Sequence, residues 1–338
     1  MYSIFRSLLF RLDPERAHSL TLNLIRLVGA LPPLRAIVSH WFHPPQKPVQ
    51  AFGLTFPNPI GLAAGYDKDG LGWRGLACLG FGHIEVGTVT PLAQPGNPKP
   101  RLFRLPQDQA LINRMGFPGR GAAFVAQRLI NRRRLNKIDS YPSFVLGVNL
   151  GKNKDTSLES AASDYLSLMH TFTPMADYLA INVSSPNTTG LRRLQARQAL
   201  NELLMVLDRE RHQNIPLLVK LAPDLSDAEL DDALDVILCN NMDGVIATNT
   251  TISRGGIISP LVKEMGGLSG APLRKLSTGL IDKIHKRTCG KLPIIGVGGV
   301  SCVTDLREKL EAGAVLVQVY TGLVYQGPGL VKTLVEDL

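Results

Sequence analysis

The sequence predicts an α/β protein, a (β/α)8 TIM barrel with a small N-terminal helical extension. The first observation behind this prediction is that eight apolar, strand-like runs follow one another beyond residue 50, with helical stretches between most of them. The second is that these runs are continuous rather than alternating, as expected of parallel strands buried on both faces. Eight β-α units over about 290 residues are what such a barrel requires. A doubly wound open sheet is the alternative, but it usually has fewer strands.

Residues 1–42 are expected to form an amphipathic helical region of their own. Apolar residues between positions 4 and 12 recur at helical spacing. Asp13 followed by Pro14 predicts the start of a second helix, because aspartate caps the first turn and proline needs no N–H partner. Residues 34–41 suggest a third, shorter helix. Such helices lie in a membrane interface or pack as a cap on the main domain, and the sequence favours neither.

A stiff linker, residues 43–50 with the run "HPPQKP", separates this region from the barrel at 51–338. Helices are expected between most of the strands, for example at 195–212 and 226–240. The eight strands are expected at 58–65, 83–90, 144–150, 178–183, 216–222, 244–250, 292–299 and 314–320.

Composition excludes a disordered chain and limits the partners. Hydrophobic residues make up 44% and charged residues 19% of the 338 positions, which is enough apolar material for a large core. The net charge of +9 suits an anionic partner such as nucleic acid, a membrane surface or a small acidic substrate. A merely basic soluble protein explains that charge equally well.

The four cysteines are scattered without a C-x-x-C pair, which argues against a metal centre, a redox motif or a disulfide framework. Buried thiols in a reducing compartment are expected instead. No segment reaches the roughly 18 apolar residues of a membrane-spanning helix. The N-terminal apolar stretch is interrupted by Arg6 and Arg11 and is not followed by a cleavage site, so it does not predict a signal peptide.

Polar residues cluster at the ends of the expected strands, where (β/α)8 barrels carry their active sites. Lys220 stands inside the apolar run "PLLVKLA", which is unfavourable unless an anionic group neutralises it. A lysine reaching out of the barrel rim is the alternative, but its flanks are apolar on both sides. The glycines of "GVGG" suit a phosphate site only weakly, since glycine-rich turns are common. The long connection 91–118 is typical of a binding loop or lid.

Many long motifs, in order along nearly the whole chain, resemble the dihydroorotate dehydrogenase family. They are "GLAAGYDKDG", "GTVTPLAQPGNPKPRLFRL", "INRMGF", "GVNLGKNKDT", "NVSSPNT", "KLAPDLS", "DGVIATNTT", "GGLSG", "PIIGVGG" and "VQVYTG". The N-terminal helices resemble those of the quinone-dependent, membrane-associated class 2 enzymes. The resemblance implies oxidation of (S)-dihydroorotate to orotate in de novo pyrimidine (UMP) biosynthesis, with one FMN per chain and a membrane quinone as electron acceptor. It also implies peripheral attachment to the cytoplasmic face of the inner membrane, without nucleic acid, a metal or a required protein partner.

The resemblance also implies a role for particular residues. Ser185 matches the class 2 catalytic base, where class 1 relatives have cysteine, and Thr188 with Phe117 matches a proton path. The implied substrate-binding residues are Lys68, Asn113, Arg114, Met115, Gly116, Phe117, Asn182, Asn187, Asn249 and Thr250. The implied FMN-binding residues are Ala64, Gly65, Tyr66, Asp67, Lys68, Thr88, Asn149, Asn182, Lys220, Thr248, Gly270, Gly299, Tyr320 and Thr321. His18 and Arg104, with Tyr320, would line a quinone tunnel, although His18 is also compatible with a plain helix surface.

Other readings are weaker. Hydroxy-acid oxidases and ene-reductases are also FMN barrels, but they lack a "SSPNT" loop. An NAD-linked dihydroorotate dehydrogenase needs an iron–sulfur subunit and normally has cysteine as its base. A membrane-surface binding module with a degenerate barrel conflicts with the intact polar strand ends, and nucleic-acid binding is supported by charge alone. The basic run 131–137 is interpreted as a solvated helix end more readily than as a lipid contact.

Overall fold

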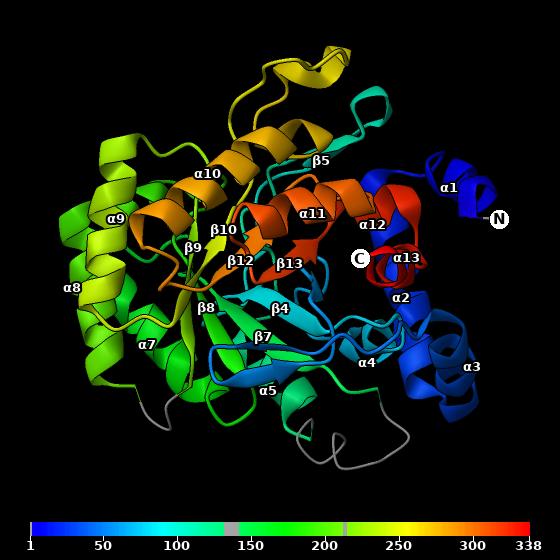
Figure 1. Ribbon diagram of the computed structural model, residues 1–338, viewed down its shortest axis with the longest axis horizontal. Helices are drawn as coiled ribbons and strands as arrows, with labels where there is room; N and C mark the ends of the chain where they lie inside the picture. The colour runs from blue at the N-terminus through cyan, green and yellow to red at the C-terminus, as the bar shows by residue number, and fades with distance from the viewer. Residues whose placement is uncertain (1, 132–141, 212–214) are drawn as a thin grey trace.

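Eight parallel strands form a closed barrel in the computed structural model, which describes residues 2–131, 142–211 and 215–338 (Figure 1). Each strand lies within one of the predicted runs, so the barrel prediction is confirmed. The basic run discussed above falls outside the described residues except for Asn131. The strands are β3 (Ile60–Leu62), β4 (His83–Val89), β7 (Val145–Leu150), β8 (Tyr178–Asn182), β9 (Leu217–Leu221), β10 (Gly244–Ala247), β12 (Ile294–Val297) and β13 (Leu316–Val319).

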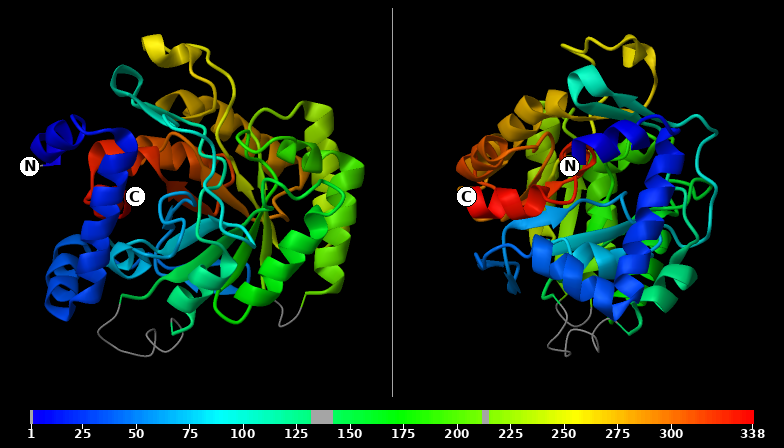
Figure 2. Two further views of the ribbon diagram at one scale, coloured as in Figure 1. Left: turned by 180° about the vertical axis from the view of Figure 1, so that it is seen from behind. Right: turned by 90° about the vertical axis from the view of Figure 1, so that its right-hand side faces the viewer.

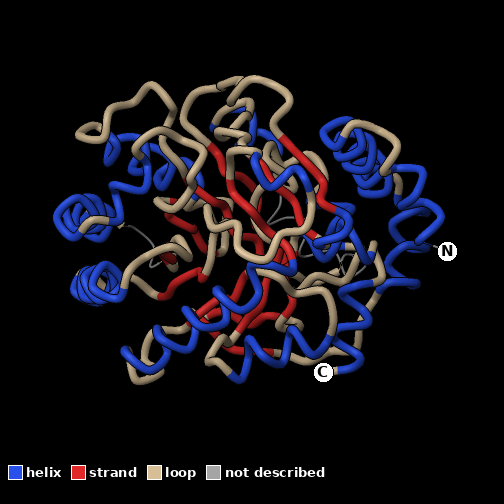
Figure 3. Tube along the Cα trace, turned by 90° about the horizontal axis from the view of Figure 1, so that it is seen from above, coloured by secondary structure: helices blue, strands red, loops and turns tan. Residues whose placement is uncertain are grey.

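A layer of helices surrounds the strands (Figure 3). The helices predicted at 195–212 and 226–240 are present as α8 and α9, and Ser226 starts α9 with a reciprocal capping box to Glu229. The helices of this layer are α4 (Trp73–Ala77), α5 (Ala122–Leu129), α7 (Ala161–Phe172), α8 (Arg197–Arg209), α9 (Asp227–Cys239), α10 (Arg274–Arg287), α11 (Val303–Glu311), α12 (Thr321–Gln326) and α13 (Leu330–Asp337).

The barrel interior is mostly apolar at its base, where the buried imidazole of His83 packs on Phe56, and polar at its mouth. At the base, side chains such as Val145, Leu218 and Ile295 fill the interior, and the hairpin of β1 (Val49–Ala51) and β2 (Leu54–Phe56) packs its Phe56 against them. The filled base leaves the C-terminal ends of the strands as the place where a cavity can form.

A second, antiparallel sheet stands at the mouth of the barrel. It consists of β5 (Leu102–Leu105), β6 (Ala110–Asn113) and β11 (Gly267–Gly270), and η1 (Pro106–Asp108) lies between β5 and β6. The connection 91–118 therefore contains a hairpin rather than irregular loop alone. β11 comes from the connection after β10, so this sheet joins two loops that lie far apart in the sequence (Figure 1).

The N-terminal segment forms α1 (Tyr2–Leu9), α2 (Pro14–Ala30) and α3 (Pro32–Phe42), which lie beside the barrel near α4 and α13 (Figure 2). The Asp13 side chain caps α2, as predicted. α2 is in backbone contact with α4, because a Cβ atom at Gly75 would overlap the carbonyl oxygen of Ile25. These helices thus pack on the barrel.

The same helices leave large apolar side chains exposed on their outer faces. Phe5, Leu24 and Trp41 are 62%, 55% and 66% exposed, respectively. No single helix among the described residues is long and apolar enough to cross a membrane. α2 and α3 satisfy that test only as a pair, and the pair is bent by 108°. The segment therefore has one packed face and one uncovered apolar face.

The expectation of buried thiols is wrong for three of the four cysteines. Cys78 is buried, but Cys239, Cys289 and Cys302 are exposed. The exposed three stand at the end of α9, just after α10 and at the start of α11, respectively. All three lie at or beside a helix end, and a helical location does not by itself specify which side of the helix a residue faces.

Candidate active site

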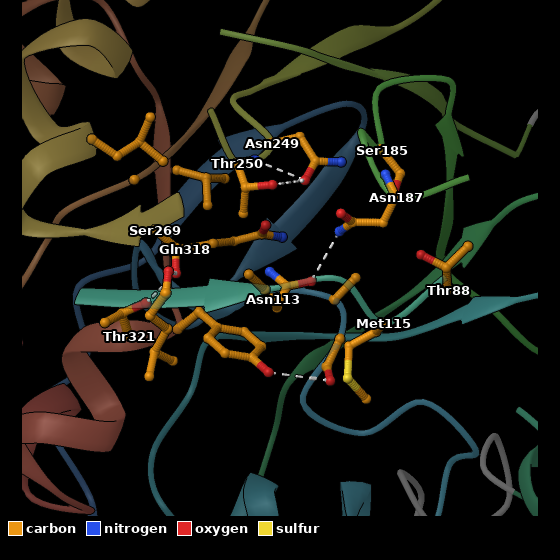
Figure 4. Close-up of a pocket in the computed structure, with 18 of the residues that line it drawn as sticks. Thr88, Asn113, Met115, Ser185, Asn187, Asn249, Thr250, Ser269, Gln318 and Thr321 are labelled. Atoms are coloured by element: carbon orange, nitrogen blue, oxygen red, sulfur yellow. Dashed lines mark hydrogen bonds between the residues drawn. The ribbon is translucent and has the colours of Figure 1, made fainter. Parts of the chain in front are cut away.

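A cavity of about 1240 Å3, its open mouth included, occupies the C-terminal ends of the strands. Residues from the barrel strands, from the β5–β6–β11 sheet and from α2 line it. Figure 4 shows Ser185 and Asn187 at one side of the pocket, with Ser269 and Thr321 at the other side of the view. The cavity brings together most of the residues that the sequence predicts. Those that line it are His18, Ala64, Gly65, Lys68, Thr88, Asn113, Met115, Gly116, Phe117, Asn182, Ser185, Asn187, Lys220, Thr248, Asn249, Thr250, Gly270, Gly299, Tyr320 and Thr321.

A fully buried carboxylate, Glu85 of β4, lies beneath the cavity floor. It accepts hydrogen bonds from Asn149 Nδ2 (2.7 Å), Tyr178 Oη (3.1 Å) and Gln318 Nε2 (2.9 Å). Lys220 Nζ lies 3.7 Å from Glu85 Oε1. Glu85 is thus the anion that a lysine inside β9 requires. Sequence reasoning missed it, although an acidic residue within the apolar run "HIEVGTVT" was the signal.

Polar side chains continue upward from Glu85 to the cavity. Asn149 Oδ1 accepts hydrogen bonds from Thr88 Oγ1 (2.6 Å) and Asn182 Nδ2 (3.0 Å). Asn182 Oδ1 in turn accepts from Ser184 Oγ at 3.1 Å, and Asn249 Nδ2 donates to Ser184 Oγ at 3.0 Å. Because each amide in this series is fixed by its neighbours, the polar floor is rigid before any ligand binds.

The two serines of the "NVSSPNT" loop occupy different environments. Ser184 is fully buried in the amide network, whereas Ser185 lines the cavity. The Ser185 hydroxyl accepts a hydrogen bond from the Asn187 backbone N–H at 3.3 Å. The nearby Thr188 hydroxyl is buried without a hydrogen-bond partner in the described structure.

Arg192, which sequence reasoning also missed, ties this loop to two others. Its guanidinium donates to the Ser184 carbonyl (3.0 Å), the Thr250 carbonyl (2.9 Å) and the Asp224 carboxylate (2.8 Å). The planar fork of arginine suits three simultaneous contacts of this kind. An arginine so soon after the predicted loop, in "GLRRLQ", was the available signal.

Lys68 and His18 stand where α2 approaches the cavity. Lys68 Nζ donates to the Gly65 carbonyl at 2.7 Å, and burial lowers its pKa to about 8. Burial, reinforced by the Lys68 charge, lowers the pKa of His18 to about 3, so its imidazole is neutral at physiological pH. The His18 ring contacts Tyr66 edge to face, with 5.0 Å between centroids.

Five residues predicted to contact substrate, FMN or quinone do not line the cavity: Tyr66, Asp67, Arg104, Arg114 and Asn149. Asn149 lies beneath the cavity floor, in the hydrogen-bond network above Glu85. The Tyr66 ring lies between the rings of His18 and Tyr320. Asp67 is buried and accepts hydrogen bonds from backbone N–H groups of the following turn, and burial raises its pKa to about 6.

The two arginines of this group point away from the cavity. The Arg114 side chain pairs with Glu264 at 2.6 Å and covers the Phe103 ring. Arg104 lies over the Phe10 ring and donates to the backbone carbonyls of Leu9 and Leu12, at the end of α1. Arg104 therefore belongs to the junction between α1 and the second sheet.

Two glycines and one unused side-chain oxygen also line the cavity. Gly298 and Gly299 line it with positive φ angles, and a Cβ atom at Gly299 would lie 2.5 Å from Arg274 Cβ. Gln318 also lines the cavity, and its side-chain oxygen is buried without a hydrogen-bond partner in the described structure. The absence of side chains at these glycines lets the start of α10 pack closely behind them, and Gln318 offers free hydrogen-bonding capacity to a bound group.

Glu85→Ala should lower the free energy of unfolding by about 3–5 kcal/mol, because it leaves Lys220 as a buried cation without its partner. Denaturant titration measures this change. Glu308→Ala is the matched control, since its contact with Arg274 at 3.6 Å is partly exposed. That control should change stability by less than about 1 kcal/mol. A loss below about 1 kcal/mol for Glu85→Ala would contradict its role as the counter-charge.

Similarity to known proteins extends over the whole chain. A family model described as dihydroorotate dehydrogenase matches residues 48–338. A protein of Idiomarina loihiensis named dihydroorotate dehydrogenase (quinone) is 47% identical, with both chains covered in full. One of the same name from Marinomonas sp. is 48% identical, covering 100% of this chain and 96% of the relative. The crystal structure of an Eimeria tenella DHODH in complex with ferulenol superposes with a TM-score of 0.86 at 38% identity, covering 96% of this chain and 90% of the other.

Proposed function

The chain belongs to the dihydroorotate dehydrogenase family, and from this premise we propose that it oxidises (S)-dihydroorotate to orotate with a membrane quinone as electron acceptor. This reaction is a step of de novo pyrimidine (UMP) biosynthesis. The observation that carries the proposal is Ser185, which lines a cavity ringed by asparagine amides at the barrel mouth. Full-length relatives that bear the quinone-dependent name support it.

The substrate would bind at the side of the cavity where the asparagines converge. Asn187 Nδ2 donates to Asn113 Oδ1 at 3.1 Å, and Asn249 Oδ1 accepts from the Thr250 N–H at 2.8 Å (Figure 4). Each amide has donors and an acceptor in one plane, which suits the flat ring of a pyrimidine. Asn182 and the segment Met115–Phe117 would complete the pocket, and Lys68 would face the substrate carboxylate.

FMN fits the remaining part of the cavity. Lys220, Thr88, Thr248 and Gln318 would contact its ring, and Gly298 and Gly299 would lie against its phosphate. Lys220 presents a cation to an anionic cofactor, and the unused Gln318 oxygen can accept a hydrogen bond from an N–H group of its ring, so the residues present suit FMN. When bound, FMN supplies the acceptor for the substrate hydride and passes the electrons to the quinone.

Ser185 would remove the proton from the carbon adjacent to the one that loses hydride. The serine hydroxyl is neutral, so it must release its own proton as it takes the substrate proton. The Thr188 hydroxyl, which is buried and unpartnered, is a group through which that proton could leave. Burial of Ser185, 5% exposed, keeps bulk water from competing for this exchange.

The quinone would reach the flavin from the side of α1 and α2. Neutral His18, Tyr320 and the Arg104 junction lie on that side of the cavity. The exposed apolar residues of the N-terminal helices would rest in the membrane interface, at the cytoplasmic face of the inner membrane. This attachment is peripheral, and no protein partner is required.

The purified protein should be yellow, and its visible flavin absorbance should bleach when L-dihydroorotate is added without oxygen. That single measurement reports both the cofactor and the first half-reaction. A yellow protein that stays yellow would indicate another substrate for an FMN barrel. A colourless protein would contradict the proposed cofactor.

Ser185→Ala should slow anaerobic flavin reduction by about 10²–10⁴-fold, the usual contribution of a general base. FMN content and orotate binding should stay near those of the native protein. Ser184→Ala is the matched control, because that neighbouring hydroxyl lies outside the cavity, and it should slow reduction far less. Unchanged reduction by Ser185→Ala would remove this serine from the role of base.

His18→Ala and Arg104→Ala should raise the KM for quinone by about ten-fold, equivalent to a loss of about 1.4 kcal/mol of binding. Flavin reduction by dihydroorotate should be retained, which rapid mixing without oxygen measures separately. Arg128→Ala is the control, since Arg128 also covers a phenylalanine ring but stands on α5. Normal quinone turnover in both test variants would place the quinone path elsewhere.

A further inference from the structure

α2 contributes a carboxylate, Glu15, to the cavity lining. Arg101 binds it with a two-pronged contact, Nε to Oε2 at 3.2 Å and Nη2 to Oε1 at 2.7 Å. Exposed Lys99 lies 3.4 Å from the same carboxylate. Burial works against the charge of Glu15, but Arg101 and Lys99 outweigh it and hold the pKa of Glu15 below its usual value. A charged, anchored carboxylate on α2 therefore faces the barrel.

Arg101 is buried and uses its remaining donors on the loop that precedes β5. Its Nη1 donates to the carbonyls of Pro95 (2.6 Å) and Asn97 (2.8 Å). The guanidinium thus fixes the loop 95–97 with one edge and Glu15 with the other. A planar guanidinium with donors on both edges holds its two partners in a fixed relative position, which a flexible ammonium group does not do.

Asn97 carries the connection on to the proposed substrate site. Its Nδ2 donates to the carbonyls of Arg114 and Asn187, both at 3.0 Å, and its backbone N–H donates to Met115 at 2.9 Å. The Asn97 side chain also packs directly on Gly116, where a Cβ atom would lie only 2.8 Å from it. One amide therefore joins the segment 114–116 to the loop that bears Ser185.

We propose that Glu15 is a positioning residue for the substrate site, acting through Arg101 and Asn97 on the Asn187 loop. The N-terminal helical segment then serves the substrate side of the cavity as well as the quinone side. Loss of the Glu15 contact frees loop 95–97 and loosens the pocket, while leaving Ser185 itself in place. Substrate affinity should fall, and the chemical step at saturation should persist. This inference rests on the proposed function.

The test compares Glu15→Gln with the native holoenzyme, both in full length. Orotate Kd is measured from the change that orotate causes in the flavin spectrum, and KM for dihydroorotate and kcat are measured with a soluble electron acceptor. We expect Kd and KM to rise by about five-fold or more, the usual lower range of coupling between linked sites. We expect kcat and FMN content to stay within about two-fold, because coupling of this kind acts on binding.

Two further variants locate the effect on the proposed path. Asn97→Ala breaks the far end of the connection and should raise KM as Glu15→Gln does. The double variant should be no worse than the more affected single one, because residues in one network are not additive. Lys99→Gln is the matched control, since it removes the exposed partner of Glu15 (68% exposed) without touching the loop, and it should resemble the native protein.

Three results would overturn the inference: an orotate Kd for Glu15→Gln within two-fold of native, a lower kcat with unchanged KM, or an equal effect of Lys99→Gln. Failure of the proposed function looks different. In that case the native holoenzyme itself neither binds orotate nor bleaches with dihydroorotate, whatever the variants do.

Discussion

The contact between the buried Glu85 carboxylate and Lys220 is the constraint on which the rest of the site depends. A cation inside a barrel strand is strongly unfavourable without a counter-charge, and Glu85 of β4 supplies it from across the barrel interior. The same carboxylate orients Asn149, and Asn149 orients Thr88 and Asn182. The upper interior is therefore a fixed polar floor, whereas the base is filled mainly by apolar side chains. A barrel packed with aliphatic side chains to the top would be simpler to fold but would have no such floor.

The cavity walls above this polar floor are built by elements that the repeated β-α units do not require. The β5–β6–β11 sheet joins the loops after β4 and β10, so Asn113 and Gly270 reach the cavity from one small platform. Arg192 performs the same task for the loops after β8 and β10 through its backbone contacts. Loops that meet a ligand must be held by something, since connecting segments are otherwise the mobile part of a fold. Here an antiparallel sheet and two arginines, Arg192 and Arg101, hold them.

The sequence was most informative where one residue type decides local structure. Continuous apolar runs predicted all eight strands, and Asp13 before Pro14 predicted the start of α2. The motifs predicted Ser185 at a strand end, and in the structure this residue lines the cavity. Pairing across long separations was not predictable: nothing local connects Glu85 to Lys220, or Asn97 to Asn187. The short β5 and β6 strands also escaped, because a four-residue strand gives too little periodicity to detect. For Cys239, Cys289 and Cys302 the pattern identified helices but not which side of each helix end faces solvent.

The two faces of the N-terminal helices have different surroundings. Outward, Phe5, Leu24 and Trp41 present apolar surface that water solvates poorly. Inward, α2 meets α4 backbone to backbone at Gly75 and fixes Arg101 through Glu15. If the N-terminal helices were joined to the barrel only by a linker, their position would have no effect on the cavity. Because α2 instead contributes Glu15 and His18 to the cavity lining, its position is set by the same contacts that set the pocket. On the function and positioning role proposed above, α2 would rest in a membrane interface and share a charge pair with the loop beside the substrate site, so it would link the two environments through the Arg101 guanidinium.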